Sequence, residues 1–290
     1  PASGCTQEFF GPPCLEFGRR ESDSDLPGYP VGWLTYNHTF RGDFDSLPGE
    51  VSSDEINFWA PILPLNFGES HLFAFLQYKG TKYNTTGPKN DLMLPEDTLS
   101  KINLPIVYIN DSPDNWLWGG MVMPTYAGSS SSSDNFTFSA AVGAGYNYSE
   151  NLQLFAGAYY SGNFGDDFVI PGVAFIWRPA PRWEVFLLGP IGGVSYSVNE
   201  NLLVSLFGDY NSSTWYVQAD ASGPDRNVSM KRLDIGVKAD WKLNSMLWGH
   251  VAGGYAVAQE LEVDNTGNHK IQDSDIDPSP FVECGLTVRF

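Results

Sequence analysis

The last ten residues, FVECGLTVRF (281–290), decide the fold class. Apolar side chains occupy every second position, at Val282, Cys284, Leu286, Val288 and Phe290, and mostly polar ones lie between them. A period of two places successive side chains on opposite faces of a β-strand. The stretch therefore predicts a strand with one apolar face and one polar face.

The same alternation recurs along the chain, clearest over 136–148, 232–242 and 247–263. Strands in soluble proteins average ~5–6 residues, whereas a tilted strand that crosses a bilayer needs ~9–11. Several segments here exceed that length. We expect fourteen strands, over 31–40, 53–63, 70–83, 100–110, 115–127, 134–148, 151–162, 166–178, 182–189, 191–198, 201–220, 228–242, 246–263 and 280–290.

The predicted connections alternate between short turns and long polar loops. Ser149–Glu150 and Asn199–Glu200 are turns, whereas 84–99 and 264–278 are loops. Outer-membrane barrels show this asymmetry, with the short turns in the periplasm and the long loops outside the cell. The pair 182–189 and 191–198 is short for two crossings, so a barrel of twelve strands stays open as the alternative.

Composition excludes several classes of protein. The 16 Lys and Arg against 34 Asp and Glu give a net charge of −18, which argues against nucleic-acid binding. Aromatic residues at 14% and hydrophobic residues at 42% are too abundant for a disordered chain. No apolar run reaches the ~20 residues of a spanning helix. No leader is visible at the start of this sequence, so we expect that any signal peptide has already been removed.

The strands resemble those of Gram-negative outer-membrane β-barrel proteins over roughly 31–290. IWRPAPRWEVFLLGP (176–190) and VSYSVNENLLVSLFG (194–208) are also similar to an uncharacterised family of such barrels. The resemblance implies an antiparallel up-and-down barrel in the bacterial outer membrane, in contact with lipid and lipopolysaccharide. It also implies that the last strand is the signal read by the barrel-insertion machinery, through Val282, Leu286, Val288 and Phe290.

Aromatic residues cluster near the predicted strand ends. Tyrosine and tryptophan prefer the two interfaces of a membrane, where they form girdles around a barrel. The expected girdle consists of Trp33, Trp116, Trp118, Tyr146, Tyr148, Trp177, Trp183 and Trp241.

Charged residues occupy the polar faces of the last three strands. We expect one wall of the lumen to carry Arg232, Asp234, Lys238, Asp240, Lys242, His250, Glu260, Glu262, Glu283 and Arg289. Such a wall either sets up a field across a water-filled pore or packs into a salt-bridge network that closes the barrel. The sequence favours neither.

Residues 1–30 differ from the rest and are expected to form an irregular periplasmic arm. Cys5 and Cys14 are spaced for a disulfide that would clip a short loop in an oxidising compartment. The arm is either a compact plug of the barrel or a tail. Together with the long loops, it is the expected contact for partner proteins.

Catalytic and metal motifs are weak. The four histidines are scattered, no G-x-S-x-G is present, and the cysteines lack the spacing of metal ligands. We therefore expect no enzyme, no metal and no cofactor. The first functional hypothesis is a passive, porin-like channel for small hydrophilic solutes. The alternative is a non-conducting structural or accessory barrel that docks partner proteins in an outer-membrane complex.

Overall fold

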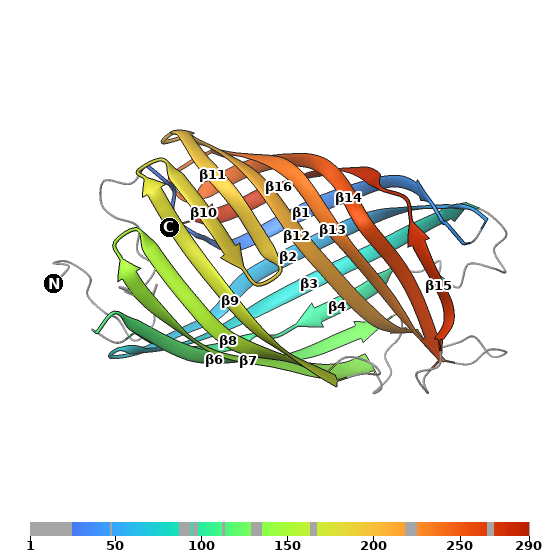
Figure 1. Cartoon of the computed structure of the whole chain (residues 1–290), viewed down its shortest axis with the longest axis horizontal. Helices are drawn as coiled ribbons and strands as arrows, with labels where there is room; N and C mark the ends of the chain where they lie inside the picture. Colours follow the sequence, from blue (N-terminus) through green and yellow to red (C-terminus); the bar gives the residue numbers. More distant parts are fainter. Residues whose placement is uncertain are drawn as a thin grey trace.

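The protein is a closed antiparallel β-barrel in a computed structural model (Figure 1). The structure describes residues 25–46, 48–86, 94, 98–111, 114–128, 135–162, 167–217, 225–265 and 270–289. Cys5, Cys14 and Phe290 lie outside the described residues, as does most of the expected arm. No helix in the described part of the chain is long and apolar enough to cross a membrane.

Sixteen strand segments make up the wall. They are β1 (Pro30–Asp43), β2 (Glu50–Phe67), β3 (Ser70–Thr86), β4 (Leu99–Asn103), β5 (Ile106–Asp111), β6 (Trp116–Gly128), β7 (Phe136–Ser149), β8 (Leu152–Gly162), β9 (Asp167–Ala180), β10 (Trp183–Leu188), β11 (Ile191–Asn199), β12 (Leu202–Val217), β13 (Arg226–Lys242), β14 (Leu247–Asn265), β15 (Lys270–Ile276) and β16 (Ser279–Arg289).

These segments form fourteen strands, as the sequence predicts. β4 and β5 both pair with β3 and β6, so they are halves of one strand that Pro105 interrupts. β15 and β16 both pair with β14 and are halves of another. The alternative of twelve strands is wrong, because β10 and β11 are separate strands joined at Gly189, whose φ is 64°.

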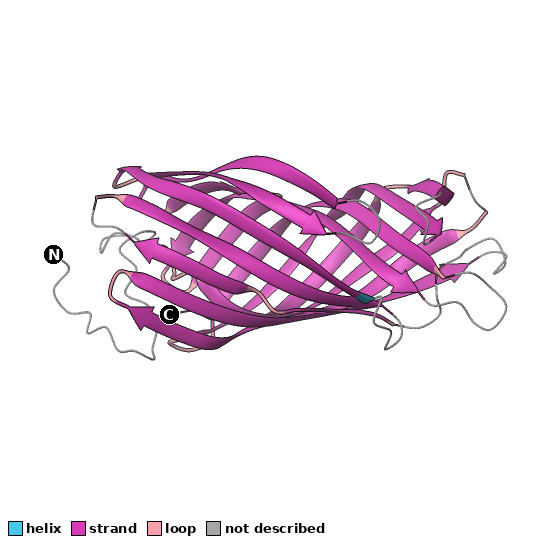
Figure 2. Cartoon of the chain, turned by 90° about the horizontal axis from the view of Figure 1, so that it is seen from below, coloured by secondary structure: helices cyan, strands magenta, loops and turns pink. Residues whose placement is uncertain are grey.

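The barrel closes where its first and last strands meet. β1 pairs with β16 in antiparallel register, with Trp33 opposite Thr287 and His38 opposite Val282. Apart from a single bridge between β12 and β6, each described strand otherwise pairs with its neighbours in the chain, which gives the expected up-and-down topology (Figure 2). Closure satisfies the main-chain groups that lipid cannot hydrogen-bond.

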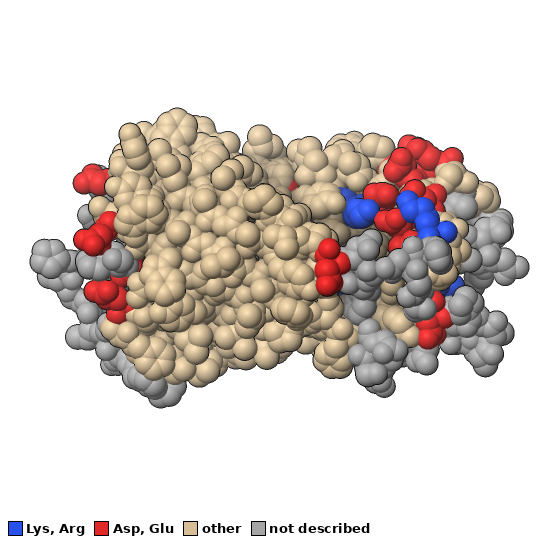
Figure 3. Space-filling model, turned by 60° about the horizontal axis from the view of Figure 1, so that its bottom comes forward, with Lys and Arg blue, Asp and Glu red and all other residues tan. Residues whose placement is uncertain are grey.

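Apolar side chains cover the outside of the barrel. Val142 is 66% exposed, Leu206 56% and Val237 52%, and each lies on the face that points away from the lumen. Figure 3 shows a broad band without charged residues on one face of the molecule, with charges toward the two ends. A surface of this kind is stable only against hydrocarbon.

Most of the expected girdle lies on this outer face near the short turns. Trp116, Tyr148, Trp177, Trp183 and Trp241 are exposed there. Trp118 is exposed on the same face of β6, and Tyr146 packs against Trp116 with ring centroids 4.8 Å apart. Trp33 is an exception to the prediction. It shares the inner face of β1 with buried Asn37 and Thr39 and stacks on Trp59 at 5.1 Å.

A bulge in β14 reverses the face of its last residues. Lys231 of β13 lies opposite Glu260, but Leu233 lies opposite Val257, so β14 carries one extra residue between them. Ala258 has a φ of 49°, as a bulge residue can. Beyond it Leu261 is fully buried inside. The expectation that Glu260 and Glu262 line the lumen is therefore wrong, since the bulge turns both outward.

The β10–β11 hairpin is much shorter than the strands beside it. Its pairing with β9 ends at Phe175, and its pairing with β12 ends at Asp209. Figure 1 shows β9 and β12 continuing beyond the hairpin tip. Among the described residues, no strand pairs with 167–174 on that side of β9. The wall of the barrel is interrupted at this point.

Candidate functional site in the barrel lumen

The inner face of β13, β14 and β16 carries paired charges. Arg232 contacts Asp234 at 3.0 Å. Arg289 contacts Asp240 at 3.2 Å, and Lys238 lies 3.9 Å from the same carboxylate. Breaking a buried pair of this kind costs ~3–5 kcal/mol. The pairs therefore fix the wall.

His250 adds a further contact within this wall. Its Nε2 lies 3.3 Å from the Glu283 carboxylate, and its Nδ1 lies 3.4 Å from the Thr287 hydroxyl. The ring is completely buried. The His250 contacts thus join the adjacent strands β14 and β16, the Asp240–Arg289 pair joins β13 to β16, and the Arg232–Asp234 pair lies within β13.

Polar contacts also cross the lumen. Lys79 of β3 pairs with Glu55 at 2.9 Å, and its ammonium lies 3.5 Å from Asn211 of β12. The Arg232 guanidinium donates to Thr39 of β1 at 3.1 Å. These contacts join β3 to β12 and β1 to β13 across the lumen.

An apolar cluster fills the lumen at the long-loop end. Its buried members are Phe44, Val51, Leu99, Ala127, Trp215, Val217, Val228, Met230, Leu261, Val263 and Ile276. They come from β2, β4, β6 and β12–β15 and from Phe44 beside β1, and Tyr216 of β12 bridges directly to Gly128 of β6. This end of the barrel is thus apolar inside, like a soluble domain.

Residues 25–29 lie at the short-turn mouth. Asp25 forms an ion pair with Arg182 at 2.7 Å and binds the Ser197 hydroxyl through its carbonyl at 2.8 Å. The Tyr29 hydroxyl donates to Glu184 at 3.1 Å and accepts from Arg178. Between these two residues, the Gly28 carbonyl accepts a hydrogen bond from the Arg289 guanidinium of β16 at 3.1 Å. It runs from one side of the mouth to the other.

The inner face of β9–β11 is apolar and accessible near the hairpin tip, whereas toward the short-turn end it carries buried polar residues such as Arg178 and Glu184. Phe168 is 40% exposed and Ile170 54%, although both share the inward face of β9 with buried Ile176. Leu188 and Ile191 at the hairpin tip are each 42% exposed and face each other across the turn. The lumen therefore has a packed charged wall and, beside the interruption, an accessible apolar one.

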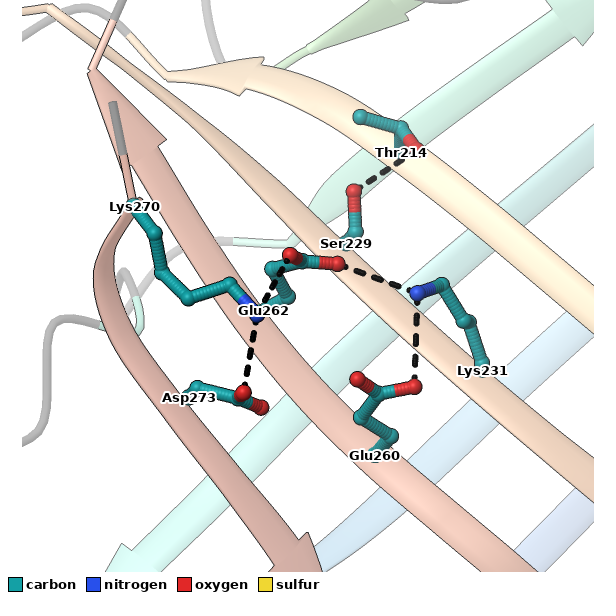
Figure 4. Close-up of polar contacts among 7 residues, drawn as sticks. All are labelled: Thr214, Ser229, Lys231, Glu260, Glu262, Lys270 and Asp273. Carbon is teal, nitrogen blue, oxygen red and sulfur yellow. Dashed lines mark hydrogen bonds and ion pairs between the residues drawn. The ribbon is translucent and has the colours of Figure 1, made fainter. Parts of the chain in front are cut away.

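Charged residues on the outer faces of β13, β14 and β15 bind one another beside this section of the barrel (Figure 4). Lys231 binds Glu260 at 3.3 Å and Glu262 at 3.0 Å. Lys270 binds Glu262 at 3.0 Å and Asp273 at 2.8 Å. These two carboxylates raise the pKa of Lys270. An ionic outer surface over an apolar interior indicates that this section stands in water above the membrane.

Many of the residues predicted for the lumen lie together on the inner face of the barrel, whereas others lie outside it. Lys242 is exposed at the end of β13, and Cys284 is a free, exposed thiol on the outer face of β16. Val282 and Leu286 are exposed on that same face. Sequence reasoning missed the apolar cluster. No pattern in the sequence indicates it, because apolar residues stay on odd positions on both sides of Ala258, at Val257 and at Leu261, and only the bulge moves Leu261 to the inner face.

No group of His, Cys, Asp and Glu in the described ranges could hold a metal ion. A closed barrel with an apolar belt, paired charges inside and ionic ends belongs to the class of membrane β-barrels.

Residues 74–289 match the family described as "Domain of unknown function (DUF6268)", and the chain belongs to that family. No curated protein matches the sequence.

Solved structures with a similar fold include outer-membrane barrels. The KdgM porin is 8% identical, with 89% of this chain and 99% of that chain covered and a TM-score of 0.34. The toluene transporter TodX of Pseudomonas putida is 9% identical, with 89% of each chain covered and a TM-score of 0.42. A FadL homologue of Pseudomonas aeruginosa is 9% identical, with 97% and 99% covered and a TM-score of 0.38.

Proposed function

We propose that this chain is a gated channel of the bacterial outer membrane for small hydrophilic solutes. The observation that carries the proposal is the wall of paired charges inside the closed barrel. Toward the long-loop end, this wall is followed by the apolar cluster. Polar groups face the lumen below the cluster, and water and solute pass only when its side chains separate. Apolar constrictions gate other pores in this way.

The charged wall gives the channel its selectivity. Asp234, Asp240 and Glu283 lie within the same wall as Arg232 and Arg289. Opposite charges on a lumen wall orient a dipolar or charged solute as it passes. The long-loop end faces the exterior and lipopolysaccharide, whereas residues 25–29 sit at the periplasmic mouth, where the preceding arm meets partner proteins.

Liposome swelling tests this function. Vesicles that contain the refolded chain should swell slowly in a pentose, since the cluster closes the path. Val228→Ser and Leu261→Ala each loosen the fully buried cluster and should speed swelling in the pentose more than in a disaccharide. Leu206→Ala, on the outer face, is the matched control and should leave the rate unchanged. Swelling that no cluster variant alters would contradict the proposal.

A second candidate is a non-conducting barrel that docks partners. The observation that favours it is the apolar cluster inside one end of the barrel, together with residues 25–29, which bind β10 and β16 at the other mouth. If folded barrels remain impermeable even after residues 1–29 are deleted together with a cluster substitution, the accessory function replaces the channel.

A further inference from the structure

The geometry points to a lateral site between β9 and β12, where a hydrocarbon chain passes between the bilayer and the lumen. We propose that this opening binds apolar or single-chain amphipathic molecules. The inference is independent of axial conduction, because the interruption lies in the wall itself.

The interruption follows from strand length. β10 and β11 end at Leu188 and Ile191, while the strands on either side continue for several residues. Pro190 still accepts from the Tyr210 amide at 3.0 Å, so the hairpin tip is fixed against β12. On the other side, the last paired residue of β9 is Phe175. The opening is thus bounded by β9, the hairpin tip and β12.

The exposure of β9 supports an open site. In a closed barrel wall, one face of a strand contacts lipid and the other packs into the lumen. From Asp167 to Val173, β9 is exposed on both faces. Farther along the same strand, Ile176 and Arg178 are buried on the inner face, where β10 covers the edge. The loss of burial therefore begins where the neighbouring strand ends.

The side chains around the opening are apolar, and they favour an apolar ligand. The outer face of this part of β9 presents Val169 and Val173, and the inner face presents Phe168 and Ile170. Leu188 and Ile191 complete the rim at the hairpin tip. Apolar residues thus continue from the lipid-facing surface to the lumen. A hydrocarbon chain is stabilised along such a path by ~0.8 kcal/mol per buried CH₂, whereas an ion is not.

A quenching experiment tests the site. Single cysteines are introduced as Ile170→Cys beside the opening, Thr35→Cys on the inner face of β1, and Val173→Cys toward lipid. Each is made in the full chain with Cys5, Cys14 and Cys284 replaced by alanine. A bimane label on each is measured in phosphatidylcholine vesicles, with doxyl-stearate as the hydrocarbon quencher and iodide as the aqueous quencher.

We expect doxyl-stearate to quench the label at Ile170 strongly, as it does at Val173, and to leave the label at Thr35 nearly unquenched. Quenching at Ile170 by iodide alone would show an aqueous pocket and overturn the proposal. Weak quenching by both agents would mean that a protein segment or a second copy covers the opening, which also overturns it. Failure of axial swelling leaves this result unaffected, so the two proposals fail separately.

Discussion

At the scale of single residues, the Asp240–Arg289 pair holds the charged wall together. Asp240 is 1% exposed and Arg289 7%. Asp240→Ala leaves a buried guanidinium without its carboxylate, so we expect the free energy of unfolding to fall by ~3–5 kcal/mol. Urea unfolding of the refolded barrel, followed by tryptophan fluorescence, measures the loss.

A double variant, Asp240→Leu with Arg289→Met, removes both charges and should recover most of that stability, because no charge stays buried without a partner. If Asp240→Ala unfolds at the same urea concentration as the wild type, the Asp240–Arg289 pair does not stabilise the barrel by this amount.

Single residues also show what sequence patterns miss. Trp33 stands near a strand end, as a girdle residue should, but its parity in β1 places it inside against Trp59. Position along the chain indicates depth in the membrane. The face of the strand on which a side chain lies depends on the register of that strand with its neighbours. A single sequence determines this register only where apolar and polar residues alternate without a break.

At the scale of elements, the bulge in β14 keeps Leu261 and Val263 inside and Glu260 and Glu262 outside. Deletion of Ala258 moves these four residues to the opposite faces, since the side-chain period of a strand is two. We expect the refolded variant to lose its heat-modifiable band on an unheated gel.

Ala258→Gly is the control, because it keeps the extra residue of the bulge and glycine readily adopts the φ of 49° found there. A deletion of Ala258 that leaves the heat-modifiable band intact would contradict the role of the bulge.

The short hairpin is the other element with a specific consequence. If β10 and β11 are each lengthened by ~4 alternating residues, the added residues should pair with β9 and with the part of β12 before Tyr216, which bridges to β6, and so narrow the opening. We expect the label at Ile170→Cys to lose its quenching by doxyl-stearate. The same insertion at the β7–β8 turn should leave the quenching as it was. Persistent quenching in the lengthened hairpin would show that the opening is not the route.

Strand number and order were predictable because lipid-facing stripes repeat on nearly every strand. The halves β4 and β5 were predicted correctly as the single strand 100–110, since Pro105 interrupts the hydrogen bonds without ending the crossing. The expectation of a loop over 264–278 is wrong for Lys270–Ile276, which forms β15 and pairs with β14, because the acidic sequence there lacks the apolar alternation that marks the other strands. The wall interruption was not predicted. The sequence showed that 182–189 and 191–198 are short. Whether short strands leave a gap in the wall depends on how far β9 and β12 continue beyond them, which the sequence did not show.

At the scale of the whole molecule, the barrel has two sections with opposite polarity. Within the apolar band, outward side chains are apolar and inward ones include paired charges. Beyond the band, the interior is apolar and the surface carries Lys231, Glu260 and Lys270. Each section follows its surroundings, lipid or water. The apolar cluster lies inside the section beyond the band. No pattern on a single strand reveals that β2, β4, β6 and β12–β15 all contribute to this cluster.

Single-channel conductance in a planar bilayer tests the central claim most directly. We expect the wild-type chain to stay closed for most of the recording, because the apolar cluster spans the lumen. Trp215→Ala removes its largest fully buried side chain and should give long openings, while Leu206→Ala on the outer face should behave as the wild type does. A barrel that conducts steadily with the cluster intact, or that never opens after Trp215→Ala although it is folded, would contradict this account.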